Sequence, residues 1–268
     1  MNQTISNMSE MILRLEKQEG VRVLYAVEAS SRAWGFPSAN SDHDVRCIYV
    51  HPIKRYLSLD GATNTCRINE GDWEVVGWDL RKALHSLRKG DPTMLEWVNS
   101  WIVYHEAPYF CSGFIPLVRK YWNPRVAYMS CRGRAFNKPP TLYEISLGRL
   151  KDYSSAVLAK RYLHSLRFLL ASRWIADKGT PPPWVLSELI TSILPYGPVR
   201  ESGLNLIAAR GNGSEEGFDF SHLTSFFNEE WVKPFPDNFA LSTMNGHEDL
   251  DDFFRACLDR FGKTYEQH

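Results

Sequence analysis

The chain has 268 residues, of which 44% are hydrophobic and 13% aromatic. This is enough apolar material for a full core and enough length for two modest domains, which excludes a disordered chain. The 31 basic side chains balance 31 acidic ones, which argues against a protein that coats nucleic acid non-specifically.

The first hundred residues are predicted to combine helices and strands. Apolar residues at helical spacing predict an amphipathic helix over 6–18, and a β-branched and aromatic run predicts a buried strand over 21–29. A second strand is predicted over 45–50 and a hairpin over 63–77, followed by helices over 79–88 and 92–97. We therefore expect a small mixed sheet with helices on one side.

Strand signals end near residue 105, and the rest of the chain is predicted to be helical. A long helical pattern covers 142–178 and ends at Gly179 and a run of three prolines. Shorter helices are predicted over 184–194, 201–210, 221–232 and 248–261. The chain is thus predicted to be an α+β protein with two domains, residues 1–105 and an all-α domain over 106–268.

The charges are unevenly distributed along the chain. Residues 119–178 contain thirteen Lys and Arg against three acids, so this segment has an excess of ten positive charges and the remainder an excess of ten negative ones. Such a division is expected where a polyanion bridges the two parts with metal ions on the acidic side. Two solvated helical faces of opposite charge are the alternative.

The cysteine pattern and the apolar stretches bear on where in the cell the protein is expected to work. The five cysteines are odd in number and form no C-x-x-C pair, which favours a reducing, cytoplasmic setting over a zinc or disulfide framework. The N-terminal segment lacks the apolar region of a signal peptide, and the most apolar later stretch is interrupted by Arg167 and Arg173. No membrane span is expected.

A polar stretch separates the first two predicted strands. Ser30 and Ser31 stand where the first strand ends and a short helical turn begins, so backbone N–H groups and two hydroxyls could hold phosphate oxygens, with Arg32 as a cationic partner. Asp42 and Asp44 are two residues apart, which places both carboxylates on one face of the second strand. Adjacent carboxylates repel one another unless a cation lies between them, and Mg²⁺ prefers such oxygen ligands.

A third carboxylate on a neighbouring strand would complete a two-metal site. Glu74 is flanked by apolar residues within a predicted strand, whereas Asp72 is better explained as a turn residue and Asp79 as a helix cap. With Asp42, Asp44 and Glu74, two Mg²⁺ ions, or Mn²⁺ in their place, would hold a triphosphate and activate an acceptor hydroxyl. A D-x-D pair alone is weak evidence, and the order of the elements around it is stronger.

This order resembles the DNA polymerase β-like nucleotidyltransferase superfamily, whose signature is a Gly-Ser pair followed, after a spacer, by D-x-[DE]. Three segments are similar to the RNA-repair nucleotidyltransferases often encoded beside RNA ligases (RlaP type): SRAWGFPSANSDHDVRCIYV, GWDLRKALHSLRKGDPTMLEWVNSWIVY and KRYLHSLRFLLASRWIADKGTPPP. The resemblance covers about residues 20 to 190. The chain departs from it at Ser30, where the family has glycine, and a side chain there narrows the approach to the backbone or opposes a positive φ.

The resemblance implies the reaction and its partners. A catalytic domain over 1–105 would transfer NMP from an NTP such as ATP to a hydroxyl, with release of pyrophosphate, and a helical domain over 106–268 would close the nucleotide cleft. Lys160 and Arg167, which with His164 fall on one stripe of the long helix, would contact the phosphates. The acceptor would be an RNA end, with tRNA as the expected substrate, and the basic segment could follow its backbone.

Three alternatives stay open at this point. The same site could modify a protein or a small molecule. Alternatively, the protein could bind nucleotide or RNA without catalysis, and serine in place of glycine at position 30 would then reflect the loss of activity. The basic stripe of the long helix could also be a solvated face. The preferred NTP and the oligomeric state do not follow from the sequence.

Overall fold

The computed structural model describes residues 2–137, 153–236, 239 and 246–263. The chain forms two compact units: the first comprises residues 1–30, 42–122 and 242–268, and the second comprises 31–41 and 123–241. This division differs from the predicted one at residue 105. The segment 106–122 and the C-terminal helix belong with the sheet, whereas the polar stretch at 31–41 belongs with the helices of the second unit.

The first unit is built on a five-stranded mixed sheet with the strand order β3-β4-β2-β1-β5. Its strands are β1 (Arg22–Glu28), β2 (His43–Val50), β3 (Thr65–Glu70), β4 (Trp73–Asp79) and β5 (Val103–Glu106). Strands β2 and β4 are parallel, and every other neighbouring pair is antiparallel. The predicted α+β class with a mixed sheet is confirmed.

Strand β5 is absent from the sequence-based expectation. Its four residues are exposed or half-buried and do not alternate between apolar and polar, so no strand period is visible. It is a strand because its backbone pairs with one edge of β1, a contact between segments far apart in the chain. The sequence-based prediction therefore missed one strand of the sheet, because that strand is defined by its pairing with β1 and not by its own residue pattern.

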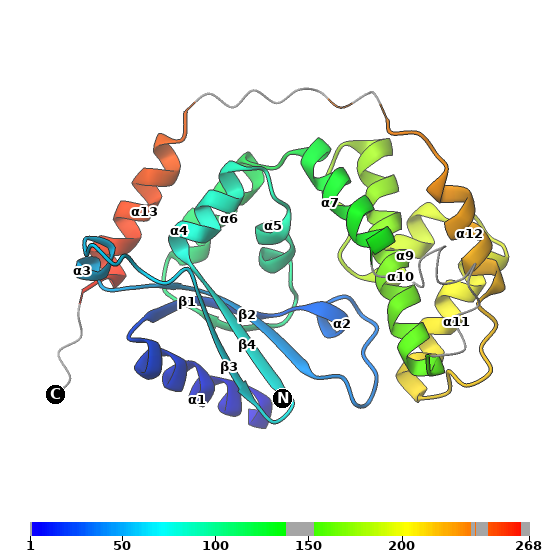
Figure 1. Cartoon of the computed structure of the whole chain (residues 1–268), viewed down its shortest axis with the longest axis horizontal. Helices are drawn as coiled ribbons and strands as arrows, with labels where there is room; N and C mark the ends of the chain where they lie inside the picture. Colours follow the sequence, from blue (N-terminus) through cyan, green and yellow to red (C-terminus); the bar gives the residue numbers. More distant parts are fainter. Residues whose placement is uncertain (1, 138–152, 237–238, 240–245, 264–268) are drawn as a thin grey trace. The chain divides into compact units, whose positions relative to one another are not determined.

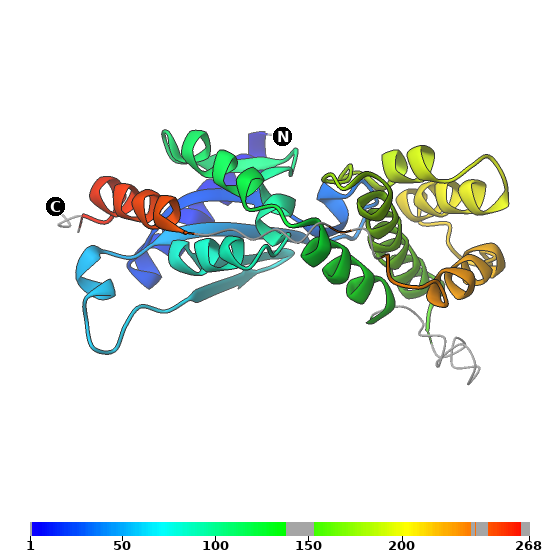
Figure 2. The same ribbon diagram turned by 90° about the horizontal axis from the view of Figure 1, so that it is seen from above.

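Helices cover both faces of the sheet, where helices on one side were expected (Figure 1). Helix α1 (Asn2–Glu19) packs Met8, Met11 and Leu15 on one face. The other face is covered by α4 (Leu80–Arg88), α5 (Thr93–Val98), α6 (Phe110–Lys120) and α13 (Glu248–Phe261), and Figure 2 shows these helices from above. The continuous apolar run of β1 explains the difference, because a strand buried on both faces has no polar face to turn to solvent.

The C-terminal helix α13 packs against α6 in the first unit. A Cβ atom at Gly113 would lie 2.7 Å from Cε2 of Phe253, so only glycine admits the aromatic ring this close to the backbone of α6. The carboxylate of Asp249 accepts hydrogen bonds from Nζ of Lys120 and the hydroxyl of Tyr121, each at 2.6 Å. These contacts place α13 beside the sheet rather than in the helical unit.

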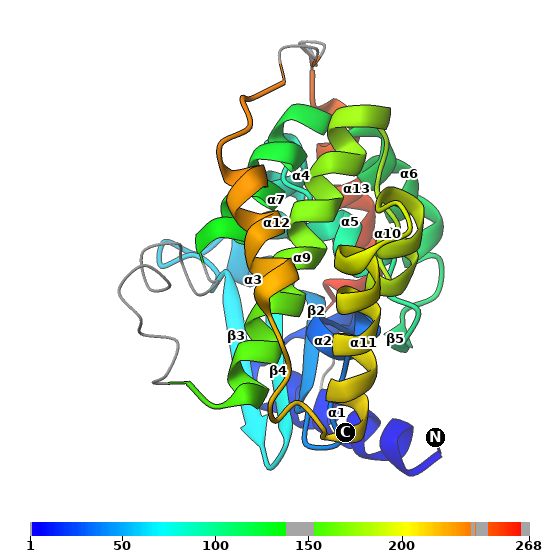
Figure 3. The same ribbon diagram turned by 90° about the vertical axis from the view of Figure 1, so that its right-hand side faces the viewer.

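The second unit is helical, and its main elements are visible in Figure 3: α7 (Pro124–Asn137), α9 (Ser155–Lys178), α10 (Leu186–Ile193), α11 (Pro198–Asn212) and α12 (Ser221–Trp231). Helix α9 is its central element and packs against α7, α10 and α11. Ser154 caps its start, and Gly179 ends it in the left-handed conformation. The predicted helical start at 142–152 lies outside the described residues.

Two short helices complete the described elements that bear on function, α2 (Ser30–Ala33) and α3 (Ile53–Tyr56). Across the described part of the chain, no helix combines the length and the apolar character needed to cross a membrane.

Candidate functional site

Two of the predicted carboxylates meet at the start of the parallel strand pair. The register of β2 and β4 places Asp44 directly opposite Glu74, on strands that lie about 4.8 Å apart. Both side chains are about one third exposed or less, with 27% and 30% of their surface accessible. The structure therefore brings together Asp44 and Glu74 from separate parts of the sequence.

An arginine occupies the position between these carboxylates. Arg46 follows Asp44 by two residues on β2, which puts the two side chains on the same face of the strand. Its Nη2 atom lies 3.6 Å from Oδ1 of Asp44 and 3.2 Å from Oε2 of Glu74. Arg67 on β3 pairs with the other oxygen of Glu74 at 3.2 Å. The carboxylates thus share one cationic group, which offsets their mutual repulsion.

The donor atoms of this pair suit a divalent cation. Carboxylate oxygens are the ligands that Mg²⁺ prefers, and the guanidinium of Arg46 marks a position where both groups stabilise positive charge. Asp42 lies just before β2 and is exposed. Among the residues that the structure describes, no three His, Cys, Asp or Glu side chains converge closely enough to hold a metal ion. The role of Asp42 as a third ligand and the binding of two ions stay predictions.

Glu28, at the end of β1, contacts the residues at the start of β2. Its side chain is fully buried, with 1% of the residue exposed. One carboxylate oxygen, Oε1, accepts the backbone N–H of Asp44 at 2.8 Å. The other, Oε2, accepts the hydroxyl of Tyr104 at 2.6 Å and lies 3.0 Å from Nδ1 of His43. A buried carboxylate is tolerated here because three donors surround it.

His43 is held by this carboxylate and by an aromatic ring. Its imidazole stacks on Trp73 with ring centroids 3.8 Å apart and an interplanar angle of 7°. On its other side the ring faces the carboxylate, with Nδ1 within hydrogen-bonding distance of Oε2 of Glu28. His43 therefore supports β2 and β4 on the face opposite to Asp44, in keeping with the period-two alternation of the strand.

Sequence reasoning did not select Glu28. The available signal was a single acid at the end of an otherwise apolar run, VLYAVE, predicted to be buried. A charge inside a buried strand needs partners, and these come from residues 43, 44 and 104, which only the fold brings to it.

Ser30 adopts a backbone conformation that favours glycine. Its φ is +56°, in the left-handed region that L-residues with a side chain rarely adopt. Immediately before it, the N–H of Ala29 donates to the carbonyl of Asp44 at 2.7 Å, which ties the end of β1 to the start of β2. The serine thus keeps the turn but carries a conformational cost that glycine would not.

Ser31 and Arg32 make contacts within the segment 31–41. The carbonyl of Ser31 accepts the N–H of Phe36 at 3.0 Å, and the side chain of Ser31 is buried. Nη2 of Arg32 donates to the carbonyl of Ser41 at 2.5 Å, so the arginine ties the two ends of the segment together. Phosphate contacts by Ser30, Ser31 and Arg32 stay predictions.

The predicted basic stripe of α9 divides into two different environments. Lys160 is exposed, whereas only 1% of Arg167 is accessible. Nε of Arg167 donates to the carbonyl of Trp184 at 3.2 Å, and its guanidinium carbon lies 4.4 Å from the ring centroid of Trp34. Arg167 therefore contributes to packing among aromatic rings inside the second unit. Its predicted contact with phosphate stays a prediction, as does that of Lys160.

The mixed sheet carries a pair of carboxylates, Asp44 and Glu74, on two neighbouring parallel strands. The strand with Asp44 follows the tight turn at Ser30. This arrangement is expected of a nucleotidyltransferase. The family model described as "RNA repair pathway DNA polymerase beta family" (RlaP) matches residues 4–256, and the chain belongs to this family. The predicted family and the predicted enzyme class, a nucleotidyltransferase with a function in RNA repair, are confirmed.

Two individual proteins are similar to this chain. The uncharacterized protein YcgL of Bacillus subtilis (strain 168) is 34% identical over 208 residues, which cover 75% of each chain. A nucleotidyltransferase-like protein from Exiguobacterium sibiricum 255-15, known from a crystal structure, aligns over 89% of this chain and 84% of its own. That alignment has 10% sequence identity and a TM-score of 0.28, which is too distant to bear on function.

Proposed function

We propose that the protein transfers a nucleoside monophosphate from an NTP to a hydroxyl of an RNA end, with release of pyrophosphate. The observation that carries the proposal is the register pairing of Asp44 with Glu74, with the guanidinium of Arg46 in contact with both carboxylates. Family membership supports nucleotidyl transfer as the reaction class and RNA repair as its setting.

In this proposal Asp44 and Glu74 hold Mg²⁺, and Asp42 supplies a further oxygen. The metal, when bound, would neutralise the triphosphate and lower the pKa of the attacking hydroxyl. Arg46 stabilises the two carboxylates in the absence of the metal, and its long flexible side chain can leave the position between them at little cost. Glu28 fixes the backbone of Asp44, so that this carboxylate needs no reordering to bind the cation.

RNA is the proposed acceptor, with tRNA as the first candidate. The family description and the excess of ten positive charges over residues 119–178 support it. ATP is the first NTP to examine, because the base preference does not follow from the carboxylate pair. We also place the protein in the reducing cytoplasm, and its five cysteines, all buried thiols, support that setting.

The test is the incorporation of α-³²P-labelled nucleotide into purified total tRNA with each of the four NTPs and Mg²⁺. Asp44→Asn is expected to lower incorporation by more than about 100-fold, because it removes a ligand rather than a residue that merely supports one. Asp60→Asn is the matched control, since Asp60 is an exposed acid of the same unit outside the carboxylate pair. Equal incorporation by the two variants would refute the assigned site.

The strained backbone of Ser30 favours one competing function, nucleotide or RNA binding without catalysis. Binding of NTP by the wild-type protein with no pyrophosphate release, unchanged by Asp44→Asn, would support it. Label transferred to a protein or a small molecule, with none in RNA, would instead keep the reaction and replace the acceptor.

A further inference from the structure

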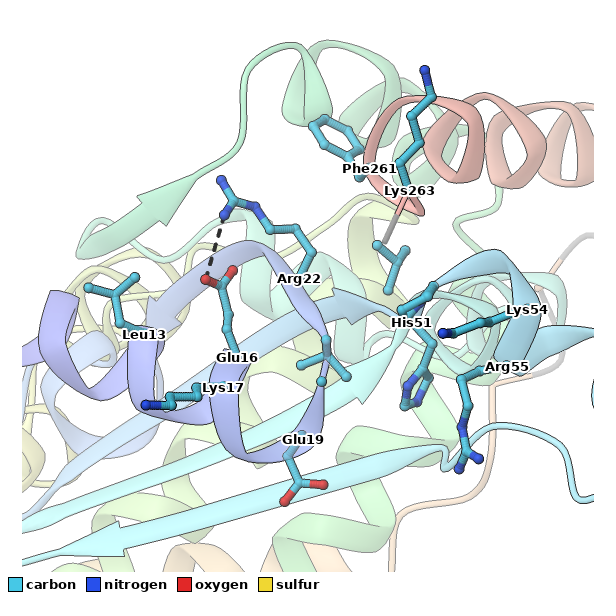
Figure 4. A pocket seen from close by; sticks show the side chains of 14 residues that line it. Leu13, Glu16, Lys17, Glu19, Arg22, His51, Lys54, Arg55, Phe261 and Lys263 are labelled. Carbon is cyan, nitrogen blue, oxygen red and sulfur yellow. Dashed lines mark ion pairs between the residues drawn. The ribbon is translucent and has the colours of Figure 1, made fainter. Parts of the chain in front are cut away.

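A cavity of about 590 Å³ lies in the first unit, and Figure 4 shows the side chains that line it. Its lining includes Val50, at the end of β2 opposite to Asp44. Five segments line it: the C-terminal half of α1, the start of β1, the end of β2, α3 and the end of α13. Strand β2 runs from Asp44 at the candidate site to Val50 at the cavity. Six residues of extended strand separate the two positions by about 20 Å.

Positive charge dominates the lining of this cavity. Five cationic side chains face two carboxylates, which leaves three positive charges in excess in a chain whose net charge is zero. One of the two acids, Glu16, is already neutralised, because it lies 3.6 Å from Arg22 and accepts the N–H of Val23 at 2.8 Å. The cationic side chains are Lys17, Arg22, Lys54, Arg55 and Lys263.

Four of these cations remain available to a ligand. Lys17, Lys54, Arg55 and Lys263 are exposed, and within the described part of the chain none of them forms an ion pair. Because all four line the same cavity, they give it a positive potential that attracts a polyanion. The apolar side chains of Leu13 and Phe261 add a surface for a sugar or a base.

Helix α3, which carries Lys54 and Arg55, is fixed in place. The N–H of Ile53 donates to the carbonyl of Gly262 at 3.0 Å. At the other end of the helix the hydroxyl of Tyr56 donates to Oδ2 of Asp79 at 2.5 Å and accepts the N–H of His51 at 3.1 Å. The backbone beneath both cations is therefore ordered before any ligand arrives, which reduces the entropic cost of binding.

We propose that this cavity, referred to below as the α3 cavity, binds backbone phosphates of the RNA acceptor away from its reacting end. The inference rests on the proposed function, because it takes the RNA from it. An NTP at the carboxylate pair cannot reach the α3 cavity, since the two sites lie about 20 Å apart along β2. A strand of RNA can occupy both, and a phosphate chain is a polyanion that cations distributed around one cavity can contact at successive phosphates without regard to sequence.

Two double variants test this proposal. Lys54→Gln with Arg55→Gln removes two cations of the α3 cavity, and Arg88→Gln with Lys89→Gln removes two adjacent exposed cations of the same unit that lie outside it. The probe is a fluorescein-labelled single-stranded RNA of about 20 nucleotides, bound by the full chain at salt concentrations from about 50 to 200 mM. The affinity for ATP is measured on the same samples, and circular dichroism checks that each variant is folded.

The α3 variant is expected to bind RNA about tenfold more weakly at low salt, with the salt slope reduced by about 1.4 for the loss of two phosphate contacts. The control variant is expected to change RNA affinity by less than about twofold, and ATP affinity is expected to stay the same in both. An equal loss in the two variants, or a loss of ATP affinity in place of RNA affinity, would overturn the proposal. Binding is measured without turnover, so weaker RNA binding in the α3 variant supports the cavity even if no nucleotide is incorporated.

Discussion

The buried carboxylate of Glu28 accepts the backbone N–H of Asp44 at 2.8 Å, across the pair of strands that frames the candidate site. The end of β1 is thereby attached to the residue on β2 that faces Glu74. Because the contact is to the backbone, it fixes the direction of the Asp44 side chain without occupying its oxygens. In the proposed function Glu28 is thus a positioning residue, which would act on the reaction through Asp44.

Replacement of Glu28 is expected to destabilise the first unit in a graded way. Glu28→Ala removes the carboxylate from three partly buried hydrogen-bond partners and is expected to lower the free energy of unfolding by about 3 kcal/mol. Tyr104→Phe removes one of the three contacts and is expected to cost about 1 kcal/mol. Urea denaturation followed by circular dichroism measures both. Equal midpoints for the two variants would show that the Asp44 and His43 contacts contribute nothing.

Ser30→Gly is expected to stabilise the protein. Its φ of +56° costs a residue with a side chain about 1 kcal/mol, and glycine avoids most of that cost. Ser30→Ala is the matched control, because alanine keeps the strain and loses only the hydroxyl. Thermal denaturation should place Ser30→Gly above the wild type and Ser30→Ala at or below it. If alanine and glycine shift the midpoint equally, the strain is not the cause.

Arg46 is expected to compete with a divalent cation for the carboxylate pair. Arg46→Gln removes the shared cation and is expected to lower the free energy of unfolding by about 1 kcal/mol in EDTA, because both carboxylates are partly exposed. In millimolar Mg²⁺ the variant should regain stability, and by more than the wild type gains, because the metal fills the vacated position.

Arg67→Gln provides the comparison, since Arg67 pairs with Glu74 alone. Its melting temperature should respond to Mg²⁺ as the wild type does. A Mg²⁺ response of the same size in all three proteins would argue that the metal binds elsewhere.

The contact of Asp249 with α6 makes the stability of the first unit depend on pH. Burial tends to raise the pKa of Asp249, but hydrogen bonds from Lys120 and Tyr121 outweigh it and hold the pKa below the ordinary value of 3.8. A carboxyl whose pKa is lower in the folded state stabilises it above that ordinary value, and this stabilisation is lost as the pH falls through the folded pKa. Asp249→Asn is expected to cost about 1 kcal/mol at pH 7, since the pair is partly exposed.

The test is urea denaturation of the wild type and Asp249→Asn between pH 7 and pH 3. The difference in unfolding free energy should shrink as the solution becomes acidic, because wild-type Asp249 then becomes neutral as well. Asp60→Asn, at an exposed acid between α3 and β3, should show no such trend. A constant difference across the range would mean that packing rather than charge holds α13 on α6.

Much of the fold could be predicted from local patterns. Helical spacing, β-branched and aromatic runs and turn residues located β1, β2, the β3–β4 hairpin, α4 and most of the later helices, because these signals are local in the sequence. Strand β5 and the position of α13 could not be predicted, since both depend on partners that lie far away in the sequence. Burial of the sheet on both faces could have been inferred from the unbroken apolar run of β1.

The sequence by itself determined the chemistry of the site: the acids at Asp44 and Glu74, the serine turn before them and membership of the family. The tertiary structure decided how these groups are arranged. The register of two parallel strands set Asp44 opposite Glu74, put Arg46 between them and brought Glu28 to the Asp44 backbone. It also buried Arg167, which the helical stripe alone had grouped with Lys160. Residue type fixes what a side chain can bind, whereas register and burial depend on the neighbours that folding supplies.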